Sequence, residues 1–114
     1  MEVGEVIRIY LVDDHPVFRM GLAGLLRSEA DITLVGECET GREALSDIPT
    51  KEIDIVVGDL ALQDMSGLEL IRELNREKRD FSILVLSMHD EDVFAERALK
   101  LGADGYLMKN TAPV

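Results

Sequence analysis

The sequence is short of tryptophan, cysteine and long apolar runs. With no tryptophan and 4% aromatic residues, it offers no platform on which nucleic-acid bases could stack. Its one cysteine, Cys38, cannot form a disulfide within the chain, which favours a reducing compartment. No apolar run approaches the roughly 20 residues needed to span a bilayer, and residues 1–5 lack the basic start of a signal peptide. We therefore expect a cytoplasmic protein that does not contact membranes.

Positive charge is also scarce. Lysine and arginine total 12 against 23 aspartates and glutamates, which gives a net charge of −11. Binding to phosphate backbones needs clustered basic side chains, so the chain is not expected to bind nucleic acid by itself. The hydrophobic fraction of 46% is typical of a globular protein, and 114 residues are enough for one domain with one core.

Short apolar segments alternate with amphipathic ones along the chain. Five segments are expected to form strands, namely residues 7–12, 33–38, 54–59, 82–87 and 105–108. Helical patterns separate them, without any repeat or low-complexity segment. This alternation predicts an α/β fold in which a five-stranded parallel sheet carries helices on both faces.

The helix expected after the first strand has one apolar face. Phe18, Leu22 and Leu25 recur at the spacing of a helix and are predicted to face the sheet. Gly21 and Gly24 weaken the helix intrinsically, so we interpret them as positions of close packing against the sheet.

Local signals mark the ends of other helices. Thr40, with Glu43 three residues later, is typical of a capping box at a helix start. Ser66 is expected to cap the next helix, and Gly102 is expected to end the one after it.

Chemically useful side chains stand at four of the five expected strand ends. Asp13 and Asp14 follow the first strand, Asp59 ends the third, Ser87 ends the fourth and Lys109 follows the fifth. Ligands of open α/β sheets bind at the carboxyl ends of the strands, so these groups are expected to meet. Carboxylates close together repel one another unless a cation intervenes, and magnesium prefers oxygen ligands. One carboxylate could then act as nucleophile and form an aspartyl phosphate, with the ammonium, the hydroxyl and the metal contacting the phosphoryl group.

These features, taken in order, resemble the receiver domain of two-component response regulators, and in particular the NarL/LuxR branch. The resemblance covers residues 7–111 and implies a flavodoxin-like (CheY-like) fold with strand order 2-1-3-4-5. Besides the strand-end residues, it rests on the segments Asp13-Asp14-His15-Pro16-Val17-Phe18-Arg19, Met65-Ser66-Gly67, Leu86-Ser87-Met88-His89 and Gly102-Ala103-Asp104-Gly105-Tyr106-Leu107-Met108-Lys109.

The resemblance implies a role for each residue of the site. Asp59 would be the phosphoacceptor. Magnesium would be held by Asp14, Asp59 and the backbone carbonyl of Ala61, with Asp13 acting through a bound water molecule. Lys109 would contact the phosphoryl group.

The resemblance also implies a conformational switch. Ser87 would contact the phosphoryl group and move toward it, and Tyr106 would turn inward in response. Ala61 and His89 flank the site and could tune the lifetime of the phosphate by controlling the approach of water.

The partner implied by the resemblance is a sensor histidine kinase, and a homodimer is a further expectation. Residues 1–114 are expected to form a single receiver domain whose last helix is truncated. The DNA-binding helix-turn-helix domain of the parent protein would lie outside the chain. Beyond its own phosphorylation and autodephosphorylation, no enzyme activity is expected.

Two other interpretations stay open. One is a receiver-like interaction module that is never phosphorylated, and the other is a small magnesium-dependent phosphohydrolase with Asp59 as nucleophile. At the level of single residues, Asp13 and Asp14 could simply cap the following helix, and Cys38 is expected to be a small core residue. His15 is expected to have no function.

Overall fold

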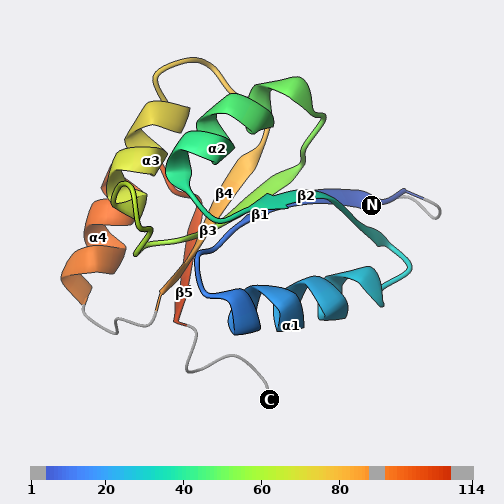
Figure 1. Ribbon diagram of the computed structural model, residues 1–114. Coiled ribbons are helices and arrows are strands. Elements are labelled where there is room, and N and C mark those ends of the chain that lie inside the picture. Colours follow the sequence, from blue (N-terminus) through green and yellow to red (C-terminus); the bar gives the residue numbers. More distant parts are fainter. Residues whose placement is uncertain (1–4, 88–91, 109–114) are drawn as a thin grey trace.

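The computed structural model describes residues 5–87 and 92–108, and it contains one parallel five-stranded sheet (Figure 1). The order of the strands is β2-β1-β3-β4-β5, as the resemblance implied. The strands are β1 (Ile7–Val12), β2 (Ile32–Cys38), β3 (Ile55–Asp59), β4 (Ser82–Ser87) and β5 (Gly105–Met108). The expected strand ranges therefore hold to within one residue at each end.

Helices cover both faces of the sheet, as predicted. Helix α1 lies on one face, and α2, α3 and α4 lie on the other (Figure 1). Their bounds are α1 (Pro16–Arg27), α2 (Gly41–Asp47), α3 (Gly67–Leu74) and α4 (Asp92–Lys100), with a short 3₁₀ helix, η1 (Ile48–Thr50), after α2. Among the described residues, no helix combines the length and the apolar character that crossing a membrane requires.

The core lies on both sides of the central strands. Successive residues of a strand point to opposite faces, so Leu11 and Val57 pack beneath α1 while Tyr10, Val12 and Val56 pack beneath α2 and α3. The last four residues of β1 are all buried. A strand that is apolar on both faces can only lie inside the sheet, and this places the end of β1 next to the end of β3.

The predicted helix ends are confirmed where local signals marked them. The hydroxyl of Thr40 accepts a hydrogen bond from the backbone N–H of Glu43 at 3.1 Å, at the start of α2. Ser66 does the same for Glu69 at the start of α3, also at 3.1 Å. Gly102 follows α4 with a φ of +115°, a conformation that glycine adopts without strain.

The prediction for α1 is wrong in two respects. The residues that face the sheet are Phe18, Leu22 and Leu26, whereas Leu25 is 65% exposed. A helix turns by about 100° per residue, so a stripe of residues four apart winds slowly around the helix. Leu25 lies outside the stripe formed by Phe18, Leu22 and Leu26. Gly21 and Gly24 also lie on the exposed side, with nothing within 4 Å of the position that a Cβ atom would take. They are therefore not sites of close packing.

Replacing Gly24 by alanine should therefore stabilise the protein. The added methyl group meets no neighbour, and alanine loses less backbone entropy than glycine when the helix forms, so the free energy of unfolding should rise by about 0.5–1 kcal/mol. Urea denaturation followed by circular dichroism measures this change. A loss of stability would mean that the outer side of α1 is covered in solution.

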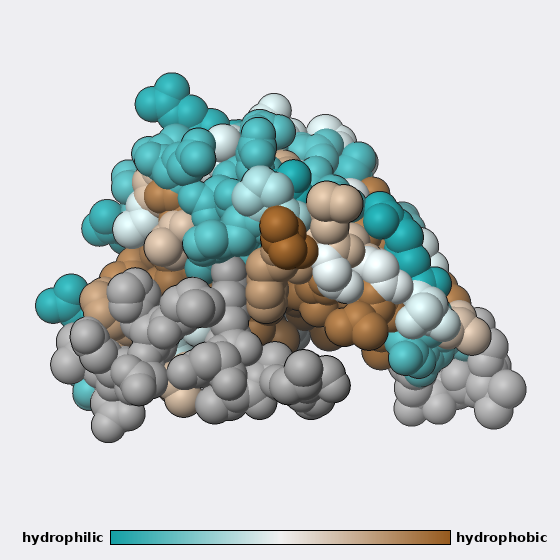
Figure 2. Space-filling view, turned by 60° about the horizontal axis from the view of Figure 1, so that its bottom comes forward, coloured by the Kyte–Doolittle hydropathy of each residue, from teal (hydrophilic) through white to brown (hydrophobic). Residues whose placement is uncertain are grey.

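Apolar side chains reach the surface on the α1 side of the molecule. In Figure 2, where this side is turned forward, apolar residues lie around the middle of the molecule while its upper part is hydrophilic. Val17, Met20 and Leu25 are exposed on α1, and Leu107 is exposed on β5. Because the three α1 residues recur at helical spacing with the two glycines between them, the outer side of α1 is a smooth apolar strip.

One arginine, Arg79, connects several segments at the amino ends of the strands, which is the end of the sheet opposite the acidic cluster. The Arg79 guanidinium donates to the backbone oxygens of Phe81 and Gly102 and to the side chain of Asn75, and it pairs with Asp104 at 3.2 Å. These partners belong to the segments that follow α3 and α4. We call this group of residues the Arg79 cluster.

Candidate functional site

The carboxyl ends of β1 and β3 bring three aspartates together. Val12 pairs with Gly58 across the two parallel strands, so Asp13 and Asp59 follow at neighbouring positions. Both residues are buried, with 1% and 2% of their surface exposed, while the Asp14 side chain is 13% exposed. One oxygen from each carboxylate and a nitrogen of His15 all lie within 4.8 Å of one another. The predicted meeting of Asp13, Asp14 and Asp59 is thus observed.

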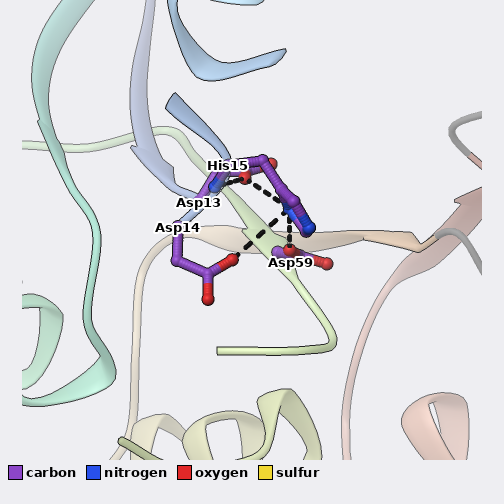
Figure 3. Close-up of side chains that lie close together, drawn as sticks. All are labelled: Asp13, Asp14, His15 and Asp59. Carbon is purple, nitrogen blue, oxygen red and sulfur yellow. Dashed lines mark hydrogen bonds and ion pairs between the residues drawn. The ribbon is translucent and has the colours of Figure 1, made fainter. Parts of the chain in front are cut away.

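The His15 ring lies among the three carboxylates (Figure 3). Its Nδ1 is 3.0 Å from Asp59 Oδ2, 3.2 Å from Asp13 Oδ1 and 3.3 Å from Asp14 Oδ1. The His15 backbone N–H also donates to Asp13 Oδ1 at 2.7 Å. Sequence reasoning gave this residue no function, and only its adjacency to the acidic pair could have drawn attention to it.

The electrostatics of the cluster favour a cation. Burial raises the pKa of the Asp14 carboxyl; the His15 ring opposes that rise, while the Asp59 and Asp13 carboxylates add to it. Asp14 Oδ1 is buried, and apart from the His15 ring nitrogen at 3.3 Å it has no hydrogen-bond donor within the described part of the chain. A buried acceptor among like charges is the environment that a hard divalent cation with oxygen ligands relieves, so the donor set fits magnesium.

The loop after β3 is held in place from two sides. The backbone N–H of Gly67 donates to the Leu60 carbonyl at 2.6 Å, and the Ala61 N–H donates to Asp59 Oδ1 at 3.3 Å. Ala61, predicted as a metal ligand, therefore lies beside Asp59. At Gly67 a Cβ atom would come within 2.5 Å of Leu60 Cα and 2.6 Å of the Asp59 backbone oxygen, so only glycine fits.

Asp64 anchors this loop to α2, and no pattern in the sequence signals this role. Its carboxylate accepts hydrogen bonds from the backbone N–H groups of Gly41 and Arg42 at 2.8 and 2.9 Å, at the start of α2. Burial pushes the pKa of Asp64 upward, but these two N–H groups, the Asp64 N–H and the Arg42 charge together outweigh burial and hold the pKa below its ordinary value. The loop that carries Ala61 is thereby anchored to a helix 23 residues earlier in the chain.

The predicted switch residues lie on the neighbouring strands. Ser87 is fully buried at the end of β4, one residue beyond Leu86, which pairs with Asp59. Tyr106 on β5 pairs with Val85 and packs against the core beneath α3 and α4. Alternation along β4 places Ser87 on the same face as Val85, so the hydroxyl and the tyrosine ring share one face of the sheet. Lys109 and His89 lie outside the described residues.

Comparison with known proteins gives the family. The sequence pattern of the response regulator receiver domain matches residues 9–114. The transcriptional regulatory protein UhpA of Salmonella typhimurium is 39% identical over 108 residues, which are 95% of this chain and 54% of UhpA. The chain thus spans about half the length of the curated relatives it matches.

Solved structures agree with this match. The LuxR-family two-component response regulator from Aurantimonas sp. SI85-9A1 is 35% identical, with a TM-score of 0.89 over 96% of this chain and 78% of that one. The isolated receiver domain of RcsB from Salmonella enterica serovar Typhimurium, solved with the phosphomimetic BeF₃⁻, is 25% identical, with a TM-score of 0.88 over 96% of this chain and 81% of that one. Together with the acidic cluster at the ends of β1 and β3, these similarities establish that the chain belongs to the family of response regulator receiver domains of two-component systems.

Proposed function

We propose that Asp59 accepts a phosphoryl group from a sensor histidine kinase in a magnesium-dependent reaction. The observation that carries this proposal is the position of Asp59, which is buried at the end of β3 within reach of two further carboxylates. An Asp59 oxygen attacks phosphorus, and the bond from phosphorus to the donor's imidazole nitrogen breaks as the new bond forms. The product is an aspartyl phosphate.

The residues around Asp59 would bind the metal ion and contact the phosphoryl group. Asp14, Asp59 and the Ala61 carbonyl would hold the metal, and Asp13 would hold one of its waters. Magnesium, when bound, offsets the negative charge that gathers on the phosphoryl oxygens. Lys109, which follows β5 in the sequence, and the Ser87 hydroxyl at the end of β4 would contact those oxygens.

The output of the phosphorylation is a change on the β4–β5 side of the sheet. Ser87 moves toward the phosphoryl group, and Tyr106, on the same face, fills the space that it leaves. Ala61 and His89 control how fast water reaches the phosphate and so set its lifetime, including any autodephosphorylation.

We propose that this phosphorylation controls transcription in the parent protein. UhpA is a transcriptional regulator of which this chain matches about half, so we propose a DNA-binding helix-turn-helix domain beyond a receiver formed by residues 1–114. Kinase contact and transcription control both place the protein in the cytoplasm. The exposed apolar strip of Val17, Met20 and Leu25 supports self-association as a homodimer. A phosphohydrolase is not favoured, because the family is a signalling rather than a catalytic one.

Intact-protein mass spectrometry after incubation with acetyl phosphate tests the proposal. We expect one phosphoryl adduct that requires Mg²⁺ and is absent from Asp59→Asn. Asp54→Asn is the matched control, because Asp54 precedes the same strand at its other end, where it pairs with Arg8, and this variant should keep the adduct.

Two results would contradict the proposal. An adduct that survives in Asp59→Asn would identify another nucleophile. A folded wild-type protein without an adduct would instead favour the interaction module that is never phosphorylated.

A further inference from the structure

His15 occupies an unusual position for a residue at a helix start. It is the N-cap residue of α1, yet its side chain makes no capping hydrogen bond. The ring turns instead into the acidic cluster, where its Nδ1 lies 3.0–3.3 Å from one oxygen of each of the three carboxylates (Figure 3). The side chain remains 50% exposed on its outer side. The ring is thus in contact with every carboxylate proposed to bind the metal, and it is open to solvent behind them.

A metal ion and this ring would need the same space. Magnesium binds oxygen at about 2.0–2.1 Å and keeps several of its own waters, so it needs room beside the carboxylates as well as between them. The ring is the group on which the three carboxylate oxygens converge, and it fills that room. We propose that the His15 ring is a displaceable occupant of the magnesium position, which must leave before the hydrated ion can bind.

The backbone around His15 allows the ring to leave while α1 stays in place. The His15 N–H is held by Asp13 Oδ1 at 2.7 Å, and the His15 carbonyl accepts from the Arg19 N–H at 2.8 Å. Both anchors belong to the backbone, so rotation about the side-chain bonds moves the ring away from the carboxylates without breaking either of them. The ring therefore competes with the ion without any change of fold.

This inference rests on the proposed magnesium site and adds a property to it. The contacts of the ring with the carboxylates stabilise the metal-free state, and the ion has to replace them. His15 consequently raises the concentration of free magnesium at which the site is half loaded, by an amount set by the contacts that the ring gives up.

A magnesium titration of the purified chain, followed by amide NMR spectra, tests the inference. Serine is favourable at an N-cap but too short to reach all three carboxylates, so His15→Ser keeps the helix start and removes the occupant. We expect the magnesium Kd of His15→Ser to be roughly five- to tenfold lower than that of wild type. Thr33→Ser, at an exposed position of β2, is the control and should match wild type.

The ring signals give a second readout that does not depend on phosphorylation. The chain contains two histidines, and comparison with His15→Ser assigns the signals of His15. In wild type these signals should shift on magnesium saturation as the ring moves into solvent. Thermal unfolding without metal establishes that each variant is folded.

The other outcomes overturn either the displacement of the ring or the magnesium site. An unchanged Kd in folded His15→Ser, or unshifted His15 signals, overturns the displacement. Weaker binding in His15→Ser also overturns it, because His15 would then be a ligand. If wild type binds no magnesium, or if Asp59→Asn binds it equally well, the proposed magnesium site itself fails, and the inference fails with it.

Discussion

An Asp14→Asn variant is expected to bind magnesium roughly a hundredfold more weakly than wild type, and to unfold at a higher temperature when no metal is present. Asp14 is largely buried, and its Oδ1 has only the His15 ring nitrogen, at 3.3 Å, as a hydrogen-bond donor in the described part of the chain. The amide removes a negative charge that a cation would bind. It also removes the repulsion from Asp13 and Asp59 that the metal-free protein has to bear.

The pH dependence of thermal unfolding tests whether the charge of Asp14 destabilises the folded protein. Burial is the largest cause that raises the pKa of Asp14 in the folded protein, so folding disfavours its charged form. The resulting loss of stability is full above the raised pKa and fades as the pH falls through that pKa toward the ordinary value of 3.8. The advantage of Asp14→Asn in thermal unfolding should therefore be present at pH 7 and shrink as the solution is acidified.

Asp31→Asn is the control that separates an effect on the metal site from a general effect of lower negative charge. Asp31 is an exposed acid before β2, and its replacement lowers the net negative charge by the same amount. Calorimetric titration with Mg²⁺ should show no change of affinity in this control. Equal magnesium affinity in Asp14→Asn and wild type would remove Asp14 from the metal site, and lower metal-free stability would show that the carboxylate stabilises the fold.

Replacing Gly67 by alanine should cost about 3 kcal/mol of the free energy of unfolding. The new methyl group would overlap the backbone of Asp59 and Leu60, at 2.6 and 2.5 Å, and backbone atoms cannot move aside as a flexible side chain can. The segment that would have to shift carries the proposed phosphoacceptor. The variant should therefore lose magnesium affinity together with stability.

Urea denaturation measures the loss in the free energy of unfolding, and Gly24→Ala is the matched control. The chemical change is the same, but the Gly24 methyl group meets nothing and should stabilise the protein. Opposite signs for the two substitutions are the expected result. A Gly67→Ala protein as stable as wild type would mean that the loop after Asp59 relaxes freely and does not fix the site.

Much of the fold could be predicted because its signals are local. Thr40 and Ser66 cap their helices through residues three positions away, and the apolar run from Ile9 to Val12 reads directly as a strand buried on both faces. The meeting of Asp13 with Asp59 could also be predicted, since carboxyl ends of neighbouring parallel strands share one edge of a sheet.

What the sequence could not provide depends on contacts between distant segments or on side-chain direction. The bond from Asp64 to the start of α2 joins residues 23 apart, and no pattern signals it. The error at Leu25 arose because spacing gives the period of an apolar stripe but not its centre on the helix. His15 was missed because its ring could point either to solvent or into the site, and only the fold decides between them.

The Arg79 cluster fixes the carboxyl end of α4 to the segment before β4. The Arg79 guanidinium binds the backbone oxygens of Phe81, which precedes β4, and of Gly102, which follows α4, and so connects these two segments. At the Asp59 end, bonds made by Arg19, Gly67 and Asp64 hold β1, the loop after β3 and the start of α2. Because α4 is bound at its carboxyl end, we expect the proposed phosphorylation of Asp59 to tilt α4 about that end, with the largest displacement at its amino end.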